Sequence, residues 1–414
     1  MFAIRADCAF DGERFVDGGV TVIIEGSTIV GVESGSSEVP DDCPITDHGR
    51  STVLPGLIDA HVHLVADSGP MALDRVAGYS DDELDAVVTE ALRRQLAGGV
   101  TTVRDLGDRR FNVVDRRAAR RPQDDRLPRI VASGPPITSP GGHCHYLGGE
   151  VASRDAIADA VRERAERGVD VVKVMASGGM NTPGTDVTAP QFALEDLRLL
   201  VDLAHRLGLP VTAHSHAAKG IDQAIEVGVD GIEHASYLSG AALPGLAGLL
   251  NVSATDQQLD TLATSGIAVC PTLGGLSPEF YRNAPPHVQE MMKAAGVTPE
   301  QIVEIVEIRM STIRRMREAG VRFVTGTDGG IAPPKAHGTC SGAVVELGSV
   351  VHAAEALATA TSRAADACRL GTSTGRLRPG LDADVLVVDG DLAADLTALR
   401  SVRQVVVRGQ LEPV

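Results

Sequence analysis

Tryptophan is absent from this sequence of 414 residues, and aromatic residues make up only 3% of it. Hydrophobic residues still reach 43%, so any core must be built mainly from aliphatic side chains. Positive charge is also scarce, because 38 Lys and Arg stand against 55 Asp and Glu and give a net charge of −17. Phosphate binding needs clustered basic side chains, so this balance argues against a nucleic-acid partner.

Paired cysteines and long apolar runs are missing as well. The six cysteines form no CxxC pair and are spread along the chain, which does not indicate a disulfide framework. No run of about 18 apolar residues is present, so we expect no membrane span. The first residues, MFAIRADCAFDGERF, lack the continuous apolar segment of a signal peptide. We therefore expect a cytoplasmic protein.

Strand-like segments occupy both ends of the chain. Apolar and polar residues alternate in VTVIIEG and STIVGVE near the N-terminus, and the segments LDADVLVVDGDL and VRQVVVRGQLEPV near the C-terminus look similar. A period of two is the pattern of a half-buried strand. We predict that residues 1–52 and 378–414 together form one small β-sandwich domain.

The middle of the chain, residues 53–377, alternates strand and helix patterns. Eight apolar segments are typical of strands, and helical patterns such as DDELDAVVTEALRRQLAGG lie between them and end in glycine. Eight βα units in succession predict an α/β fold of the (β/α)8 TIM-barrel type, whose interior is usually aliphatic. An open sheet of six strands is the alternative.

Potential metal ligands occur where the predicted strands end, which is where barrel enzymes place their functional groups. His61 and His63 flank Val62 on the first strand and therefore point to the same side. Later strands supply, in order, Lys173 in VVKVMASGG, His214 and His216 in TAHSHAAKG, His234 in GIEHAS, and Asp328 in VTGTDGG. A single histidine is more often structural, but this series at separate strand ends suits a metal such as zinc.

Lys173 lies within an apolar strand. Burial of an ammonium group is costly unless it is paired or neutralised, and desolvation lowers the pKa of the amine and makes it nucleophilic. Such an amine can react with carbon dioxide to form a carbamate, whose two oxygens can bridge two metals. A lysine paired with a neighbouring carboxylate is the alternative.

Together these segments resemble the amidohydrolase superfamily, and within it the imidazolonepropionase-like and prolidase-like branch. GLIDAHVHL, VVKVMASGG, TAHSHAAKG, IEHAS and VTGTDGG carry the resemblance, which extends to the C-terminal LRPGLDADVLVVDGD. The resemblance implies a binuclear site with two divalent metal ions, expected to be Zn²⁺, bridged by a carbamate on Lys173 and by a hydroxide.

The resemblance also implies individual roles. His61, His63 and Asp328 would bind the more buried metal, and His234 with His214 the more exposed one. The spacing to His234 favours His214 over His216, which would then lie behind a ligand or near the substrate. Asp328 would serve in addition as the catalytic base.

A glycine-rich loop, ITSPGGHCHYLGGE, follows the third predicted strand. By resemblance, His143 contacts the substrate near its scissile carbonyl and has a catalytic role, with His145 as the alternative; we place Tyr146 on the substrate side too. Metal binding by Cys144 is a less favoured interpretation. The family often has a tyrosine three residues after the histidine of the fifth strand, and Ala217 at that position argues against carbonyl polarisation by a tyrosine.

We therefore predict an enzyme that hydrolyses the amide C–N bond of a small molecule, such as a dipeptide or an N-acyl amino acid. Alternatives are an imidazolonepropionase-like cyclic amidohydrolase, a deaminase, an aryl urea or carbamate hydrolase, and a non-enzymatic assembly protein. A mononuclear deaminase does not need Lys173, and an assembly protein does not need six ligand positions. The acidic net charge leans toward a basic substrate side chain, and the Ala- and Val-rich segment 349–367 predicts a homo-oligomer.

Overall fold

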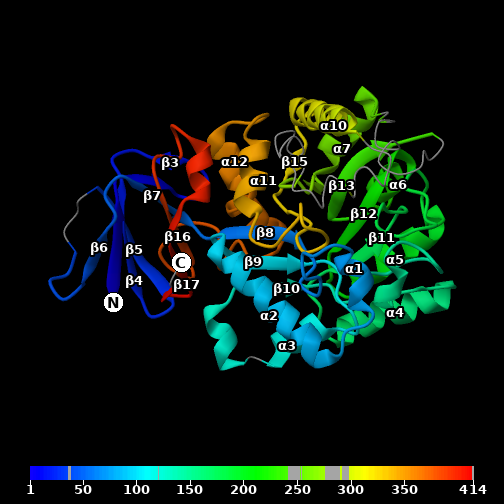
Figure 1. The fold of residues 1–414 in the computed structure, drawn as a ribbon, viewed down its shortest axis with the longest axis horizontal. Helices are drawn as coiled ribbons and strands as arrows, with labels where there is room; N and C mark the ends of the chain where they lie inside the picture. Colours follow the sequence, from blue (N-terminus) through cyan, green and yellow to red (C-terminus); the bar gives the residue numbers. More distant parts are fainter. Residues whose placement is uncertain are drawn as a thin grey trace.

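The computed structural model describes residues 1–35, 39–119, 121–240, 254–275 and 298–412, together with Val252 and Glu290. Figure 1 shows an all-β part that contains both chain ends and lies beside a larger part of mixed helices and strands. The two parts are joined where β7 is followed directly by β8. The predicted domain bounds at residues 52 and 378 stay a prediction, and the pairing of the two ends is described next.

The all-β part contains a six-stranded sheet of order β18-β17-β16-β7-β2-β3 and a four-stranded sheet of order β5-β4-β1-β6. Their strands are β1 (Phe2–Ala6), β2 (Cys8–Phe10), β3 (Phe15–Val16), β4 (Val20–Glu25), β5 (Thr28–Ser34), β6 (Ile45–Asp47), β7 (Ser51–Pro55), β16 (Val385–Asp389), β17 (Val402–Val407) and β18 (Gln410–Glu412). Strand β16 pairs antiparallel with β7 along its length. Alternating side chains such as Ile4, Val22 and Val385 form a separate apolar core there.

The larger part contains eight parallel strands in chain order: β8 (Leu57–Val62), β9 (Val100–Asp105), β10 (Arg129–Ala132), β11 (Val172–Met175), β12 (Val211–Ala217), β13 (Gly231–Leu238), β14 (Ala268–Cys270) and β15 (Arg322–Phe323). They form one sheet of order β10-β9-β8 and one of order β11-β12-β13-β14-β15. Single parallel bridges join Ile137 to Val174 and Val62 to Gly329. The arrangement is a TIM-barrel-type α/β fold, as the alternation of strands and helices predicts, although the described strands do not form one continuous closed sheet.

Helices separate and cover these strands (Figure 1). They are α1 (Ala72–Val76), α2 (Asp81–Ala97), α3 (Asn112–Ala119), α4 (Arg154–Glu166), α5 (Leu194–Arg206), α6 (Ala218–Val227), α7 (Asp256–Ser265), α10 (Pro299–Ala319), α11 (Cys340–Leu347), α12 (Ala353–Thr359) and α13 (Ser362–Ala367), with short 3₁₀ turns η1 (Pro122–Arg126), η2 (His145–Leu147) and η4 (Leu396–Arg400). Capping boxes fix where several begin: the Thr298 side chain accepts from the Gln301 amide at the start of α10. That helix ends at Gly320, whose φ of 92° suits glycine.

The segment 349–367 contributes to the interior rather than to the surface. Ala356 and Leu357 on α12 and Ala364 and Ala365 on α13 are fully buried. These apolar side chains therefore pack within the chain and offer no apolar face to a second copy. The homo-oligomer stays a prediction, and an exposed apolar surface on segment 349–367 no longer supports it.

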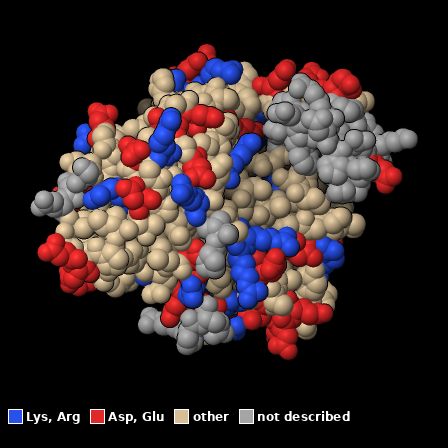
Figure 2. Space-filling model, turned by 60° about the vertical axis from the view of Figure 1, so that its left-hand side comes forward, with Lys and Arg blue, Asp and Glu red and all other residues tan. Residues whose placement is uncertain are grey.

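Charged side chains are interspersed on the surface. On the face drawn in Figure 2, acidic residues are scattered over the periphery among basic ones. None of the described helices is both long enough and apolar enough to cross a membrane.

Candidate active site

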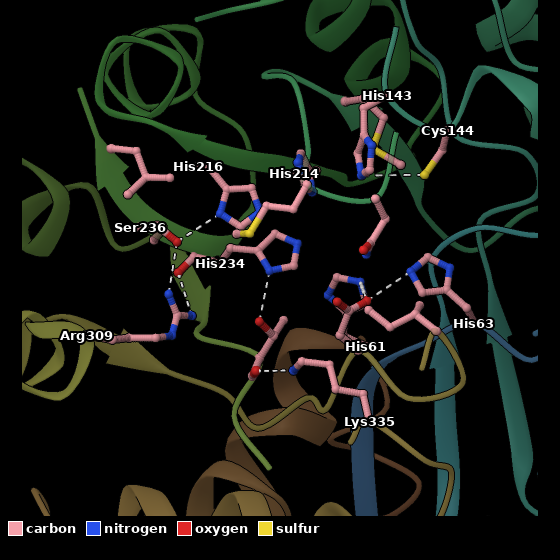
Figure 3. Close-up of a pocket in the computed structure, with 18 of the residues that line it drawn as sticks. His61, His63, His143, Cys144, His214, His216, His234, Ser236, Arg309 and Lys335 are labelled. Atoms are coloured by element: carbon pink, nitrogen blue, oxygen red, sulfur yellow. Dashed lines mark hydrogen bonds and ion pairs between the residues drawn. The ribbon is translucent and has the colours of Figure 1, made fainter. Parts of the chain in front are cut away.

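A cavity of about 240 Å³ lies at the carboxyl ends of the barrel strands (Figure 3). The six predicted metal ligands all line it: His61, His63, Lys173, His214, His234 and Asp328. His143, Cys144 and His216 line it too. Residues that are far apart in the sequence thus meet in one place, because each lies on or shortly after one of the parallel barrel strands.

The first cluster consists of His61, His63 and Asp328. One oxygen of Asp328 lies 3.4 Å from His61 Nε2 and 3.1 Å from His63 Nε2. The remaining ring nitrogens are also used: His61 Nδ1 donates to Glu233 at 2.8 Å, and His63 Nδ1 to the carbonyl of Gly107 at 3.3 Å. These bonds direct both Nε2 atoms toward the same carboxylate oxygen.

Electrostatics keep Asp328 ionised. Burial alone would raise its pKa, but the hydrogen bond from His63 and the charges of His61 and His63 lower it well below its ordinary value. Burial and the charge of Lys173 lower the pKa of His61 to about 4. At neutral pH the cluster therefore offers an anionic oxygen next to the neutral imidazole of His61, which is the form that binds metals. The pKa of His63 is raised instead, because its hydrogen bond and charge interaction with Asp328 outweigh burial.

The second cluster consists of His214, His216 and His234, whose nitrogen ligand atoms lie within 4.8 Å of one another. The rings of His216 and His234 are stacked with centroids 4.4 Å apart, and His214 crosses His234 at 4.6 Å. Burial is the largest cause that lowers the pKa of all three. The geometry groups His216 as closely as His214, so it does not separate the two as metal ligands.

Lys173 lines the same cavity as the two clusters. Its side chain is almost fully buried on β11, and burial lowers its pKa, against the opposing effect of Glu233 and Asp328. Its charge also lowers the pKa of His61 in the first cluster and of His214 in the second. A lysine in this position is close to both potential metal sites, as a bridging group would have to be.

His143 reaches the cavity from the glycine-rich loop (Figure 3). Its Nδ1 lies 2.8 Å from the hydroxyl of Thr182, and that hydroxyl accepts from the amide of Cys144 at 3.1 Å. The hydroxyl proton is then available to Nδ1, and this arrangement favours the imidazole proton on Nε2, which lies 3.5 Å from the sulfur of Cys144. Gly179 makes room for the ring, because a Cβ there would lie 2.4 Å from it.

His145 and Tyr146 are not among the described residues that line the cavity. They begin the short turn η2, where His145 is only partly buried and the Tyr146 hydroxyl lies 3.7 Å from the sulfur of Cys144. Their assignment to substrate binding finds no support in this geometry. His337 is bonded to the carbonyl of Ala66 and to Gln95, and it is not among the described residues that line the cavity.

Sequence reasoning missed two buried acids that hold the ligands in place. Glu233 accepts from His61, from Arg104 at 3.1 Å and from Thr212 at 2.6 Å, and the positive charges around it lower its pKa despite burial. Asp59 accepts from both the amide and the hydroxyl of Thr327, next to Asp328. An acid inside an apolar strand, as in GIEHAS and GLIDAHVH, was the available signal.

Strained backbone coincides with the site. His234 and Asp328 have positive φ angles of 69° and 61°. Cys144 and Thr272, which also line the cavity, have positive φ angles of 56° and 50°. Left-handed conformations are unfavourable for residues with a Cβ and concentrate where function demands them. The fold holds these two side chains in place at the expense of local stability.

The residues present fit divalent metal ions. The first cluster offers two imidazoles and a carboxylate, and the second offers three imidazoles whose lowered pKa values keep them neutral. Neutral imidazole nitrogens with carboxylate oxygens are the donors that zinc and similar metals prefer. Paired clusters of this kind at the strand ends of a TIM-barrel-type fold are typical of metal-dependent hydrolases.

This chain belongs to the Amidohydrolase family, whose profile matches residues 52–411. The family generally uses a divalent metal. The family and its hydrolase members support the assignment of this chain as a hydrolase that acts on C–N bonds. An uncharacterized protein of Mycobacterium tuberculosis is 28% identical over 282 residues, which are 67% of this chain and 64% of that protein. The match thus spans less than two thirds of the length of that relative.

Relatives with named activities differ in what they act on. Ochratoxinase of Aspergillus niger is 25% identical over 390 residues, covering 86% of this chain and 74% of that enzyme. The crystal structure of a Xaa-Pro dipeptidase with bound methionine in its active site superposes with a TM-score of 0.82 at 26% identity, covering 99% of both chains. The likeness confirms the expected family and leaves the substrate to be proposed.

Proposed function

We propose that this protein is a binuclear metal-dependent hydrolase that cleaves the amide C–N bond of a dipeptide or an N-acyl amino acid. The observation that carries the proposal is the buried Lys173 in one cavity with two ligand clusters, where its charge acts on a histidine of each cluster. A mononuclear deaminase, the second candidate, has no use for a buried lysine at that point. The dipeptidase and ochratoxinase relatives support an amide substrate.

His61, His63 and Asp328 would hold one metal, His234 with His214 or His216 the other, and Lys173, as a carbamate, would bridge them. Divalent metal ions supply Lewis-acid polarisation and lower the pKa of water. Asp328 has two oxygens, so one can serve as a ligand while the other accepts a proton from the attacking water. The same carboxyl can then pass that proton to the nitrogen of the leaving amine, which departs poorly unless it is protonated.

His143 is placed to bind the carbonyl oxygen of the substrate. Burial lowers its pKa to about 3, so the ring is neutral at working pH, and the contact with Thr182 favours the tautomer that carries the proton on Nε2. A neutral N–H donor of this kind can stabilise the negative charge that develops on the carbonyl oxygen.

Metal content is the first test. Protein purified without chelator is expected to contain about two divalent metal ions per chain, predominantly zinc. Elemental analysis by mass spectrometry measures this directly, and reconstitution with zinc after chelation should restore hydrolysis in a panel of dipeptides and N-acyl amino acids. A reproducible content near one would favour the deaminase-type site, and a content near zero would contradict both.

The His143→Ala variant tests the carbonyl contact. It is expected to keep its full metal content and to lose about 10²-fold in kcat, the usual effect of removing one donor to a developing oxyanion. His205→Ala on α5 is the matched control, because His205 is exposed and pairs with Asp230 away from the cavity. Equal turnover in the two variants would remove His143 from the mechanism.

A further inference from the structure

Arg309 is the one basic residue on the face of α10 that lines the cavity. Ile305, Arg309, Thr312, Ile313 and Met316 line the cavity from this helix, at the three- and four-residue spacing of a single helical face. A guanidinium among apolar side chains is costly unless an anion or a full set of hydrogen bonds accompanies it.

In the described part of the chain, Arg309 bonds only to neutral acceptors. Nη1 donates to the hydroxyl of Ser236 at 2.9 Å, and Nη2 donates to the carbonyls of His234 and Pro271. Nε is buried and has no hydrogen-bond partner. The positive charge of Arg309 is thus not matched by any described carboxylate bonded to it, and the five N–H groups of the guanidinium have three acceptors among the described residues.

Lys335 is a second cation of the same kind. Its Nζ donates to the carbonyl of Thr272 at 2.6 Å and to that of Thr327 at 2.8 Å. An ammonium group has three protons, so a further donor remains. Arg309 and Lys335 bond to the consecutive residues Pro271 and Thr272 after β14, which places the two cations beside the same short segment (Figure 3).

Neither cation forms an ion pair with a described carboxylate. Asp328 and Glu346 act on both cations without a hydrogen bond to either, and Glu346 accepts from the amide of Gly274. Asp328 is the single acidic residue among the described residues that line it, and Asp328 is engaged by His61 and His63. Figure 3 shows Arg309 and Ser236 on the side of His234 that is remote from His63. A negative group on the substrate, placed beyond the metal clusters, would supply a carboxylate in direct contact with the two cations.

We propose that Arg309, assisted by the charge of Lys335, binds a free carboxylate of the substrate, so that the substrate class is dipeptides or N-acyl amino acids with an apolar C-terminal side chain. The inference rests on the proposed function and narrows its range of substrates to those with a free carboxylate. The apolar side chain would contact the other residues on this face of α10, together with Leu238 and Ile331. The guanidinium fork matches a carboxylate geometrically as well as electrically.

Calorimetry with matched product-like ligands tests the subsite without turnover. The zinc-loaded enzyme is titrated with L-leucine and with L-leucinamide, which lacks the carboxylate. We expect L-leucine to bind about 10- to 100-fold more tightly, the usual effect of hydrogen bonds to a charged group. Arg309→Met should abolish this preference, Arg309→Lys should restore part of it, and Lys335→Met should reduce it.

Arg315→Met is the matched control, because Arg315 lies on the same helix, pairs with Asp256 and does not line the cavity. It should keep the full preference. Comparison of acid and amide within one variant separates carboxylate binding from any structural effect of Arg309 on His234, which would weaken both ligands alike. Equal binding of the two ligands to the wild-type enzyme, or a preference that survives Arg309→Met, would overturn the subsite.

Release of leucine or leucinamide from N-acetyl-L-leucine and N-acetyl-L-leucinamide separates the subsite from the proposed function. A calorimetric preference without any hydrolysis would leave the carboxylate subsite standing and contradict the hydrolase. Equal kcat/KM for the acid and the amide would leave the hydrolase standing and overturn the subsite. A preference in both measurements supports both.

Discussion

Replacement of Asp328 by Asn is expected to lower kcat by about 10²- to 10⁴-fold, the range associated with loss of a general acid–base group. Asparagine keeps an oxygen near His61 and His63 but cannot accept and return a proton. The variant should therefore retain much of its metal while losing turnover. Metal content and kcat are measured on the same zinc-loaded preparation.

Asp256→Asn serves as the control for this substitution, since Asp256 is exposed at the start of α7 and is unrelated to the cavity. Its kcat should match that of the wild-type enzyme. If Asp328→Asn, with both metals bound, turns over nearly as fast as the control, Asp328 is a ligand only and the proton transfer assigned to it is wrong.

The second large effect is expected for Lys173→Ala. The variant loses the group that we propose as the bridge between the two clusters, so we expect metal content to fall toward one ion per chain. We also expect a loss of at least about 10³-fold in kcat, comparable with the loss of the most important groups in other hydrolytic sites. Short carboxylic acids added to the variant should restore part of the activity by occupying the space of the missing carbamate.

Labelled bicarbonate gives a readout that does not depend on activity. Wild-type enzyme prepared with ¹³C-bicarbonate should show a carbamate carbon by NMR, and Lys173→Ala should not. High-resolution density for an unmodified amine at Lys173, with both metals in place, would contradict the carbamate.

The candidate metal ligands could be predicted from the sequence because each predicted barrel strand is an apolar segment followed by a polar residue. An apolar strand that terminates in a histidine or an aspartate places that side chain at the mouth of the barrel, whatever the loops do. His61, His63 and Asp328 meet for this reason. The two chain ends were equally readable, because their alternation has a period of two.

Side-chain alternation alone could not have found Glu233. It precedes His234 on β13, so regular alternation would send the two to opposite faces. Yet Glu233 bonds to His61, and the ring of His234 lies 5.4 Å from that of His61. The left-handed backbone at His234 breaks the alternation, and nothing in local sequence preference predicts such a conformation for a histidine.

The conformation of the glycine-rich loop and the cavity-facing side of α10 could not be predicted from the sequence, for other reasons. The turn η2 takes His145 and Tyr146 out of the cavity, and the conformation of a glycine-rich loop does not follow from periodicity. The face of α10 that carries Arg309 is selected by packing against the barrel. As a result, the acidic net charge pointed toward a basic substrate, whereas the cations inside the cavity point toward an acidic one.

Strand β7 leads into β8, which carries the metal-ligand candidate His61, and β7 pairs with β16 from the C-terminal part of the chain. Strands near both chain ends therefore help to position the metal ligands. Strand β7 ends at Pro55, and β8, which carries His61, begins at Leu57. Gly56, between them, leaves no room for a side chain, because a Cβ there would lie 2.2 Å from the hydroxyl oxygen of Thr101. We therefore expect a barrel cut out at Gly56 for a chimera or domain exchange to lose the strand that fixes the start of β8. A transplanted catalytic unit has to bring residues from both ends of the chain with it, and a fusion partner at the C-terminus has to leave β17 and β18 paired.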